Sequence, residues 1–216
     1  GGSGSALIIA YKGTFLTLKY LLALAAVCVS TLSFAQTITV TDVLGREVTF
    51  ESPAKRVVVG FYPEDYMAIG TEAAYDNVVG MSKYIWQARS ASWQAYVAHR
   101  PSLDDIPEIG RVDTNAFSVE KVISLSPDVV MLADWQFKAL ESDVERMKSA
   151  GIAVVVVDYN AQTVERHVQT TKLIGEITGQ QERAETIANE YKQNVEMISD
   201  RLAKANLDKP KVYTEY

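Results

Sequence analysis

The sequence predicts an α/β protein whose parallel sheet carries helices on both faces. After Pro53 the chain alternates four short, almost wholly apolar runs with helical stretches. Apolar runs without a polar side are typical of parallel strands that are covered on both faces. Before that point, residues 37–50 alternate apolar and polar side chains around residues 42–45, which indicates a small antiparallel hairpin.

The apolar runs and the stretches between them define the expected elements. The strands are RVVVGF (56–61), NVVGM (77–81), DVVMLA (128–133) and IAVVVVDY (152–159). The helices are PEDYMAIGTEA from residue 63, SASWQAYVAHR from 90, SVEKVISL from 118 and ALESDVERMKSAG from 139. Pro63 suits a first helical turn, Ser118 can cap the helix that follows it, and Gly151 ends the last of these helices.

The stretch SVEKVISLSPDVVMLAD (118–134) predicts a helix that passes directly into a buried strand. Val119, Val122 and Ile123 form the apolar face of the helix, and Pro127 biases Ser126 away from helical geometry. A βαβ crossover has this form because the helix packs on the sheet that the next strand joins.

The last third of the chain predicts a long helix that connects two bodies. TVERHVQTTKLIGEITG reaches a helix terminator at Gly179, and an apolar stripe then recurs at spacings of four and three residues from Ile187 to Leu202. At about 1.5 Å per residue, residues 180–206 would be roughly 40 Å long, which exceeds the width of a lobe of this size. KPKVYTEY then predicts a new strand after Pro210.

Four segments are therefore expected. They are a linker and signal peptide (1–35), an N-terminal α/β lobe (36–179), an interdomain helix (180–207) and the first strand of a missing C-terminal lobe (208–216). The opening GGSGS has the composition of a linker and is excluded from the fold.

The leading segment has the pattern of a secretory signal peptide. Lys12 and Lys19 precede the apolar run LLALAAVCV (21–29), and small residues precede a cleavage position at Gln36. A membrane anchor is the alternative, but an apolar run of about 15 residues is shorter than the roughly 20 needed to span a bilayer. Lipidation at Cys28 is a further alternative, although Val27 stands where a small residue is wanted. We expect export to the periplasm.

Composition excludes two classes of function. The 216 residues have a net charge of −6, with 48% hydrophobic and 22% charged residues, so the chain can form a globular core. Its scattered cations do not predict a nucleic-acid surface, which needs clustered positive charge. Cys28 is the one cysteine, so the rest of the chain can form neither a disulfide framework nor a cysteine-based metal site.

Several of these stretches together resemble a known family. The order TVTDVLGREVTF, PAKRVVV, IPEIGRV, SVEKVISLSPDVVML and the long helix is similar to the substrate-binding proteins of iron-siderophore, haem and cobalamin ABC importers, over nearly all of residues 37–216. The resemblance implies two lobes joined by one rigid helix, with the ligand held between them. It also implies an ABC permease in the inner membrane as a partner, with Glu120 as the docking carboxylate of the first lobe.

The expected binding site lies at the carboxyl ends of the strands, where ligands bind in open parallel sheets. Aromatic rings follow each apolar run, and Lys83, Arg89, Arg100 and Arg111 lie in loops or helix ends nearby. Rings suit a bulky, partly planar ligand, and cations suit an anionic chelate. The expected ligand-binding residues are Tyr62, Lys83, Tyr84, Trp86, Arg111, Trp135 and Tyr159.

The expected function is capture of a ferric siderophore or similar metal chelate and its delivery to the permease, without a resident cofactor. Haem, cobalamin, or a molybdate or tungstate oxyanion held near Ser82 or Ser118 are the alternative ligands. Direct metal ligation is disfavoured because the chain has two histidines, His99 and His167.

A secreted α/β enzyme is the competing class of protein. Asp134 and Asp158 at strand ends are its candidate catalytic carboxylates. GxGxxG, GxxxxGK[ST] and GxSxG motifs are all absent from the sequence, and no nucleophile and base pair stands out. A binding protein, and not an enzyme, is therefore predicted.

Overall fold

A computed structural model describes residues 35–205 and 211–213 of the chain. The expected signal peptide, with the alternatives of an anchor and of lipidation at Cys28, lies outside the described residues. Residues 206–210 and 214–216 lie outside them as well.

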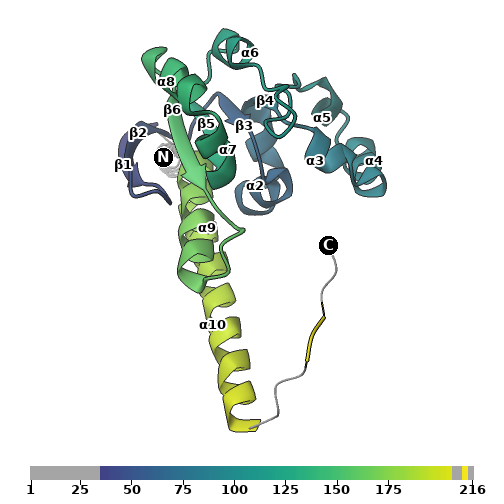
Figure 1. The fold of residues 1–216 in the computed structure, drawn as a ribbon, viewed down its shortest axis with the longest axis vertical. Coiled ribbons are helices and arrows are strands. Elements are labelled where there is room, and N and C mark those ends of the chain that lie inside the picture. Colours follow the sequence, from purple (N-terminus) through teal and green to yellow (C-terminus); the bar gives the residue numbers. More distant parts are fainter. Residues whose placement is uncertain (1–34, 206–210, 214–216) are drawn as a thin grey trace, which may run out of the picture. The chain divides into compact units, whose positions relative to one another are not determined.

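The predicted hairpin is confirmed. Strands β1 (Gln36–Thr41) and β2 (Glu47–Ser52) pair antiparallel, with Ile38 opposite Phe50. Side chains on β2 alternate between exposed and buried, so one face of the hairpin packs on the lobe and the other meets solvent. The hairpin lies beside β6 at the edge of the main sheet (Figure 1).

The four apolar runs form one parallel sheet, as predicted. Its strands are β3 (Val57–Val59), β4 (Val78–Met81), β5 (Val129–Ala133) and β6 (Ala153–Val157), in the spatial order β4-β3-β5-β6. The chain goes from β3 to β4 on one side and then returns to β5 on the other side of β3. Strand order therefore reverses between β3 and β5, which makes this pair the topological switch point.

All the predicted helices are present, and three short ones were not expected. The expected helices are α2 (Pro63–Gly70), α4 (Ser90–His99), α6 (Val119–Ser124), α8 (Glu141–Ser149), α9 (Val164–Thr178) and α10 (Gln181–Ala205). The others are α3 (Tyr84–Gln87), α5 (Ser102–Asp105) and α7 (Asp134–Ala139), with a 3₁₀-helix η1 (Glu72–Asn77) after α2. Helix α7 starts directly after β5 and α3 starts soon after β4, where sequence reasoning expected open loops.

The sheet is covered on both faces, as its apolar strands require. Val57 and Val59 face one hydrophobic cluster, which includes residues of the hairpin, α2, α3 and α9. Val58, between them, faces a second cluster formed with α6 and α8. This alternation follows from the two-residue period of a strand, and it divides the core into two layers.

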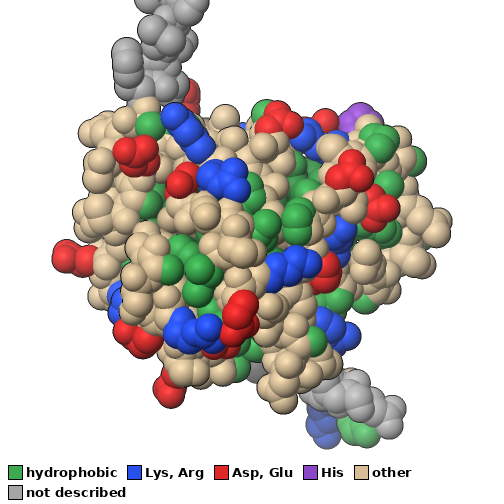
Figure 2. Space-filling model, turned by 90° about the horizontal axis from the view of Figure 1, so that it is seen from above, with side chains coloured by type: hydrophobic (Ala, Val, Ile, Leu, Met, Phe, Trp, Pro, Cys, Tyr) green, Lys and Arg blue, Asp and Glu red, His purple; other side chains and the backbone are tan. Residues whose placement is uncertain are grey.

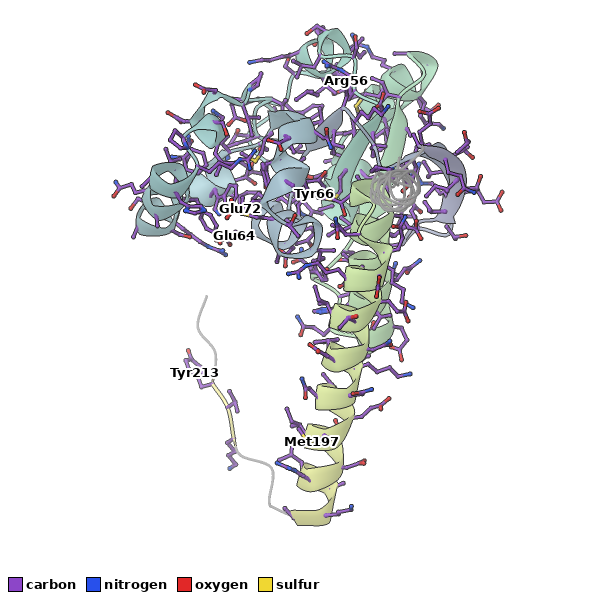
Figure 3. All side chains as sticks on the ribbon, turned by 180° about the vertical axis from the view of Figure 1, so that it is seen from behind. Arg56, Glu64, Tyr66, Glu72, Met197 and Tyr213 are labelled. Carbon is purple, nitrogen blue, oxygen red and sulfur yellow. The ribbon has the colours of Figure 1, made fainter. Side chains whose placement is uncertain are left out.

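The long helix α10 packs on α9 and then leaves the lobe. Gly179 ends α9 in the left-handed conformation at φ 72°, and a Cβ added to Gly175 would lie 2.4 Å from the Cβ of Ala184. The missing side chain therefore lets the two helices approach closely. Beyond Ala188 the side chains of α10 become exposed, and Met197 lies on the projecting part of the helix (Figure 3).

Two further findings concern the end of the chain and membrane insertion. Lys211–Tyr213, the described part of the expected last strand, is not in a strand here, and a strand that pairs within a second lobe stays a prediction. A strand needs a hydrogen-bonded neighbour, and these residues have no strand partner among the described residues.

Among the described residues, no helix is both long and apolar enough to cross a membrane.

A buried carboxylate fastens the hairpin to the sheet. Asp42, which is fully buried, accepts hydrogen bonds from the backbone amides of Leu44, Arg46 and Val156 at 3.0, 3.1 and 3.2 Å. The Arg46 guanidinium pairs with the same carboxylate and also donates to the Val154 carbonyl. The Asp42 carboxylate thus holds together the turn of the hairpin, Arg46 and strand β6.

We predict that Asp42→Asn lowers the free energy of unfolding by about 3 kcal/mol, because it leaves a partly buried guanidinium and a buried amide without their anionic acceptor. Urea denaturation measures the change. The matched control is Glu47→Gln on exposed β2, which we expect to stay within about 0.5 kcal/mol of the parent. Equal stability of the Asp42→Asn variant and the parent would contradict the role of this carboxylate.

Candidate functional site

The carboxyl ends of the four strands meet at one edge of the sheet, as expected for parallel strands. Arg56 precedes β3 and Glu64 follows it on α2. Figure 3 shows Glu64 on the side of the lobe toward which α10 projects, and Arg56 at the opposite end. The residues after each strand therefore border the space beside the projecting helix.

A glutamine joins the two strands at the switch point. The Gln136 side chain, which is buried, donates to the Gly60 carbonyl at 3.0 Å and accepts from the Ala133 amide at 3.1 Å. A Cβ at Gly60 would lie 2.9 Å from the Met131 carbonyl oxygen, so glycine permits the close approach of the strand ends. The loops after β3 and β5 thus leave the sheet side by side.

Aromatic rings follow one another along this edge from β5 to α10. The ring centroids are 5.3 Å apart for Trp135 and Phe61, 4.8 Å for Phe61 and Tyr62, and 5.3 Å for Tyr62 and Tyr159. Each of these pairs is T-shaped. The run continues from Tyr159 to His167 at 5.3 Å and from His167 to Tyr191 at 5.2 Å. We call these six residues the aromatic run.

Tyr62 sits at the centre of the aromatic run under backbone strain. Its φ of 55° is in the left-handed region, which a bulky residue rarely adopts, and it precedes the first turn of α2. The Tyr62 hydroxyl accepts a hydrogen bond from the Tyr159 amide at 3.1 Å. Burial raises the pKa of the Tyr62 phenol to about 12. The hydrogen bond joins the loops after β3 and β6 and helps to offset the cost of the strained backbone.

Tyr159 is held from a second direction. Its hydroxyl hydrogen-bonds Thr171 Oγ1 at 2.7 Å, and burial raises the pKa of this phenol. Since Thr171 lies on α9, the ring is fixed between the sheet edge and the helix. Trp135 and Tyr159 are half-buried, so parts of both rings remain available to a ligand.

The residues after β4 form a separate part of the edge. The Tyr84 ring lies under the Arg111 guanidinium, whose carbon is 4.0 Å from the ring centroid, and burial raises the pKa of Tyr84. Arg111 is at the same time paired with Asp113, with Nε 3.1 Å from Oδ1. The Lys83 side chain is buried and donates to the Asp104 carbonyl at 2.7 Å.

The structure does not place Trp86 at the edge, contrary to the expectation that its ring is open to a cleft. Trp86 is fully buried, with ring centroids 4.7 Å from Tyr96, 5.7 Å from Tyr75 and 5.8 Å from Trp93. The reason is the unexpected helix α3, which turns the residue two positions after Tyr84 into the core. Its indole Nε1 has no hydrogen-bond partner among the described residues.

The cations expected near the site already have partners inside the lobe. Arg89 pairs with Glu64 at 2.6 Å, and Arg100 pairs with Asp76. With the contacts of Lys83 and Arg111 given above, each of the four faces a carboxylate or a carbonyl. An anionic ligand would therefore compete with partners that the lobe supplies.

Sequence reasoning missed a cavity at the α10 end of the aromatic run. It has a volume of about 300 Å³ and is lined by Asp65, Ala68, Ile69, Tyr159, His167, Thr171, Ile187 and Tyr191. His167 was assigned to packing or exposure on α9, yet it is half-buried and stacks on Tyr191 at an interplanar angle of 11°. The available signal was the four-residue spacing of His167 and Thr171, which places both on one helix face.

The remaining candidate residues lie elsewhere. Glu120 is exposed on α6, at the end of the lobe away from the projecting part of α10 (Figure 1), and Arg146 Nη2 lies 2.9 Å from its Oε1. Acidic and basic side chains are interspersed on the surface seen from that end (Figure 2). His99 contacts Glu72, and within residues 35–205 and 211–213 no group of three or more potential ligands is arranged to hold a metal ion.

The described residues thus form an α/β lobe with an aromatic edge, from which α10 projects. Residues 60–215 match the model of the periplasmic binding protein family. The crystal structure of the TroA-like periplasmic binding protein FepB from Veillonella parvula is 32% identical, with a TM-score of 0.73 over 81% of this chain and 51% of that chain. The chain belongs to the periplasmic binding protein family, which is one of binding proteins and not of enzymes.

Two curated relatives match a similar part of the chain. The ABC transporter substrate-binding lipoprotein YvrC from Bacillus subtilis is 25% identical over 81% of this chain and 50% of the relative. A cobalamin-binding protein from Halobacterium salinarum is 28% identical over 82% of this chain and 43% of the relative. The chain thus spans about half the length of the curated relatives it matches.

We predict that stability falls as pH rises through 10 to 12, in part because of Tyr62. Its phenol has a higher pKa in the folded protein than the ordinary value of 10, so unfolding releases a proton in this range and alkali favours the unfolded state. Tyr62 alone accounts for a loss on the order of 1 kcal/mol at pH 11. Urea midpoints of the parent and of Tyr62→Phe between pH 8 and 11 test this.

Tyr62→Phe removes both a hydrogen bond and a titrating phenol, and the urea midpoints between pH 8 and 11 distinguish the two effects. Loss of the hydrogen bond from the Tyr159 amide lowers stability equally at every pH, whereas loss of the phenol flattens the decline above pH 10. Parallel curves for the two proteins would show that Tyr62 does not contribute to the alkaline decline.

Proposed function

We propose that this protein is the periplasmic solute-binding component of an ABC importer. It captures a ferric siderophore or a similar metal chelate and delivers it to a permease in the inner membrane. The observation that carries this proposal is the aromatic run, which follows the strand ends across the switch point and reaches the helix that leaves the lobe.

The chemistry of the edge suits a chelate better than a bare ion. Aromatic rings supply large contact area and edge or face contacts to a bulky, partly planar ligand, and their polar atoms fix its orientation. Tyr62, Tyr84, Trp135 and Tyr159 are the rings proposed to contact the ligand, and Arg111 is the cation proposed to reach it. Lys83 and Trp86 would support these loops from within the lobe.

Two lobes are part of the proposal. The matched residues make up about half the length of the relatives, and α10 projects beyond the lobe with exposed apolar side chains such as Ile198 and Leu202. We infer that a second lobe packs at the far end of α10 and forms the opposite wall of the site. The proposed periplasmic location is supported by the predicted signal peptide and by the relatives, one of which is named as a lipoprotein.

Cobalamin is the second candidate ligand. It is favoured by the relative from Halobacterium salinarum, whose name states that it binds cobalamin. Its corrin is also a large planar ring system that stacks on aromatic side chains. Haem shares this feature, whereas molybdate or tungstate would make little use of the aromatic run.

We predict that a ferric chelate quenches the tryptophan fluorescence of the full-length protein through Trp135. Trp135 is the one tryptophan in the aromatic run, whereas Trp86 and Trp93 pack together away from it. The titration uses ferric hydroxamate and catecholate chelates, haem, cobalamin and molybdate. Trp135→Phe should abolish most of the quenching, and the matched control Trp93→Phe should retain it. Saturable binding of molybdate alone would overturn the choice of a chelate.

We predict that Glu120→Ala slows transport and leaves ligand affinity unchanged. Glu120 is exposed on α6, at the end of the lobe away from the projecting part of α10, so it can contact a permease without contacting ligand. The measurements are uptake into vesicles that contain the permease and ligand titration of the isolated protein.

The matched control for docking is Glu145→Ala, which removes another exposed, paired carboxylate from the neighbouring helix α8. It should support normal uptake. Weaker ligand binding in Glu120→Ala, or equal slowing by both variants, would count against a specific docking role for Glu120.

A further inference from the structure

The cavity at the α10 end of the aromatic run is built from four separate elements. Asp65 comes from the first turn of α2, Tyr159 from the loop after β6, His167 and Thr171 from α9, and Tyr191 from α10. Its volume of about 300 Å³ is at the lower end of the range for small-molecule sites. The cavity therefore has room for one substituent of a chelate, and not for a whole one.

Three rings enclose one side of this cavity. His167 lies between the other two, in a T-shaped contact with Tyr159 and stacked on Tyr191. The hydrogen bond between the hydroxyls of Thr171 and Tyr159 fixes the first ring in place. Ring faces carry negative electrostatic potential, and a group of rings that line one space attracts a cation.

A carboxylate lines the same cavity. Asp65 forms no ion pair with any residue that the structure describes, and its side chain keeps access to solvent. Desolvation by the surrounding protein, aided by nearby Glu64, raises the pKa of this carboxyl. A position in the first turn of α2 stabilises an acidic residue by itself, but that effect does not require a cavity lined with rings beside it.

The other charges near this carboxylate are already matched. Glu64 and Arg89 pair with each other, and Ser92 also donates to Glu64. His167 lines the cavity, and outside the lining the Arg183 guanidinium donates to the carbonyl of Ala68 at 2.8 Å. Asp65 therefore has no paired cation among the described residues, whereas Arg89 and Arg100 each pair with a carboxylate.

We propose that this cavity binds a cationic group of the transported ligand, such as a primary amine or a quaternary ammonium. The inference rests on the proposed function, which it makes more specific: the preferred chelate carries a positively charged arm. The rings of Tyr159, His167 and Tyr191 surround the cation, and Asp65 supplies the opposite charge. Tyr191 belongs to α10, so the arm reaches the connecting helix while the body of the chelate lies on the remaining rings.

The test compares two ferric hydroxamate chelates that differ in one terminal group, a free primary amine in one and its N-acetyl derivative in the other. The titrations use the full-length protein at one fixed pH near 8, where a primary amine is protonated. We expect the amine to bind about tenfold more tightly. Asp65→Asn should bring the two affinities within about twofold of each other.

The matched control is Asp105→Asn, which removes an exposed carboxylate on α5 that does not line the cavity. It should keep the tenfold preference. Circular dichroism and urea midpoints check that both variants fold like the parent. Equal affinities for the two chelates in the parent, or an unchanged preference in Asp65→Asn, would overturn the cation site and leave the proposed capture of chelates intact.

A second measurement does not depend on chelate binding. The chain has two histidines, so the imidazole resonances of His167 can be assigned with a His167→Gln variant. Tetramethylammonium should shift these resonances saturably in the parent and in Asp105→Asn, and not in Asp65→Asn. If no chelate binds but this shift is seen, the cation site stands and the proposed function fails. If the shift is missing from the parent, the cation site is excluded.

Discussion

The site depends on one constraint, the close approach of β3 and β5 at the point where strand order reverses. The Gly60 amide donates to the Met131 carbonyl, and buried Gln136 completes the join by bonding Gly60 and Ala133. Apolar packing on two faces holds the sheet together, but it does not determine how the chain leaves each strand. These three hydrogen bonds fix the path of the chain where it leaves β3 and β5, and this brings Phe61 and Trp135 into contact. The other rings of the aromatic run continue from that pair.

The same edge of the lobe is packed against α10, the helix that leaves the lobe. Gly175 allows α9 and α10 to pack at very short range, and Tyr191 continues the aromatic run onto α10. Lobe and helix therefore share both a core contact and the aromatic run, which favours a rigid junction over a flexible hinge. A ligand bound on the whole aromatic run would also contact α10.

Much of this arrangement could be predicted from sequence because it follows from short-range patterns. Unbroken apolar runs identify strands buried on two faces, and the edge where those strands end follows from their being parallel. Trp86 could not be placed, because the choice between an open loop and the single turn of α3 depends on its packing with Tyr75 and Tyr96. The ion pairs of Arg89 and Arg100 could not be predicted either, because their partners lie 24 or more residues away in sequence.

In the described part of this lobe, the aromatic rings would contribute more to ligand binding than the cations. The cations at the edge are held by internal partners, so displacing them costs much of the energy that a new ion pair with ligand would return. Ring surfaces carry no such cost, since removing them from water is favourable wherever the ligand is apolar. Affinity in such a site grows with the area covered, and one wall can cover only one side of a chelate. A second wall is then a physical requirement for tight binding, and the projection of α10 along the open side of the edge supplies the place where that wall would stand.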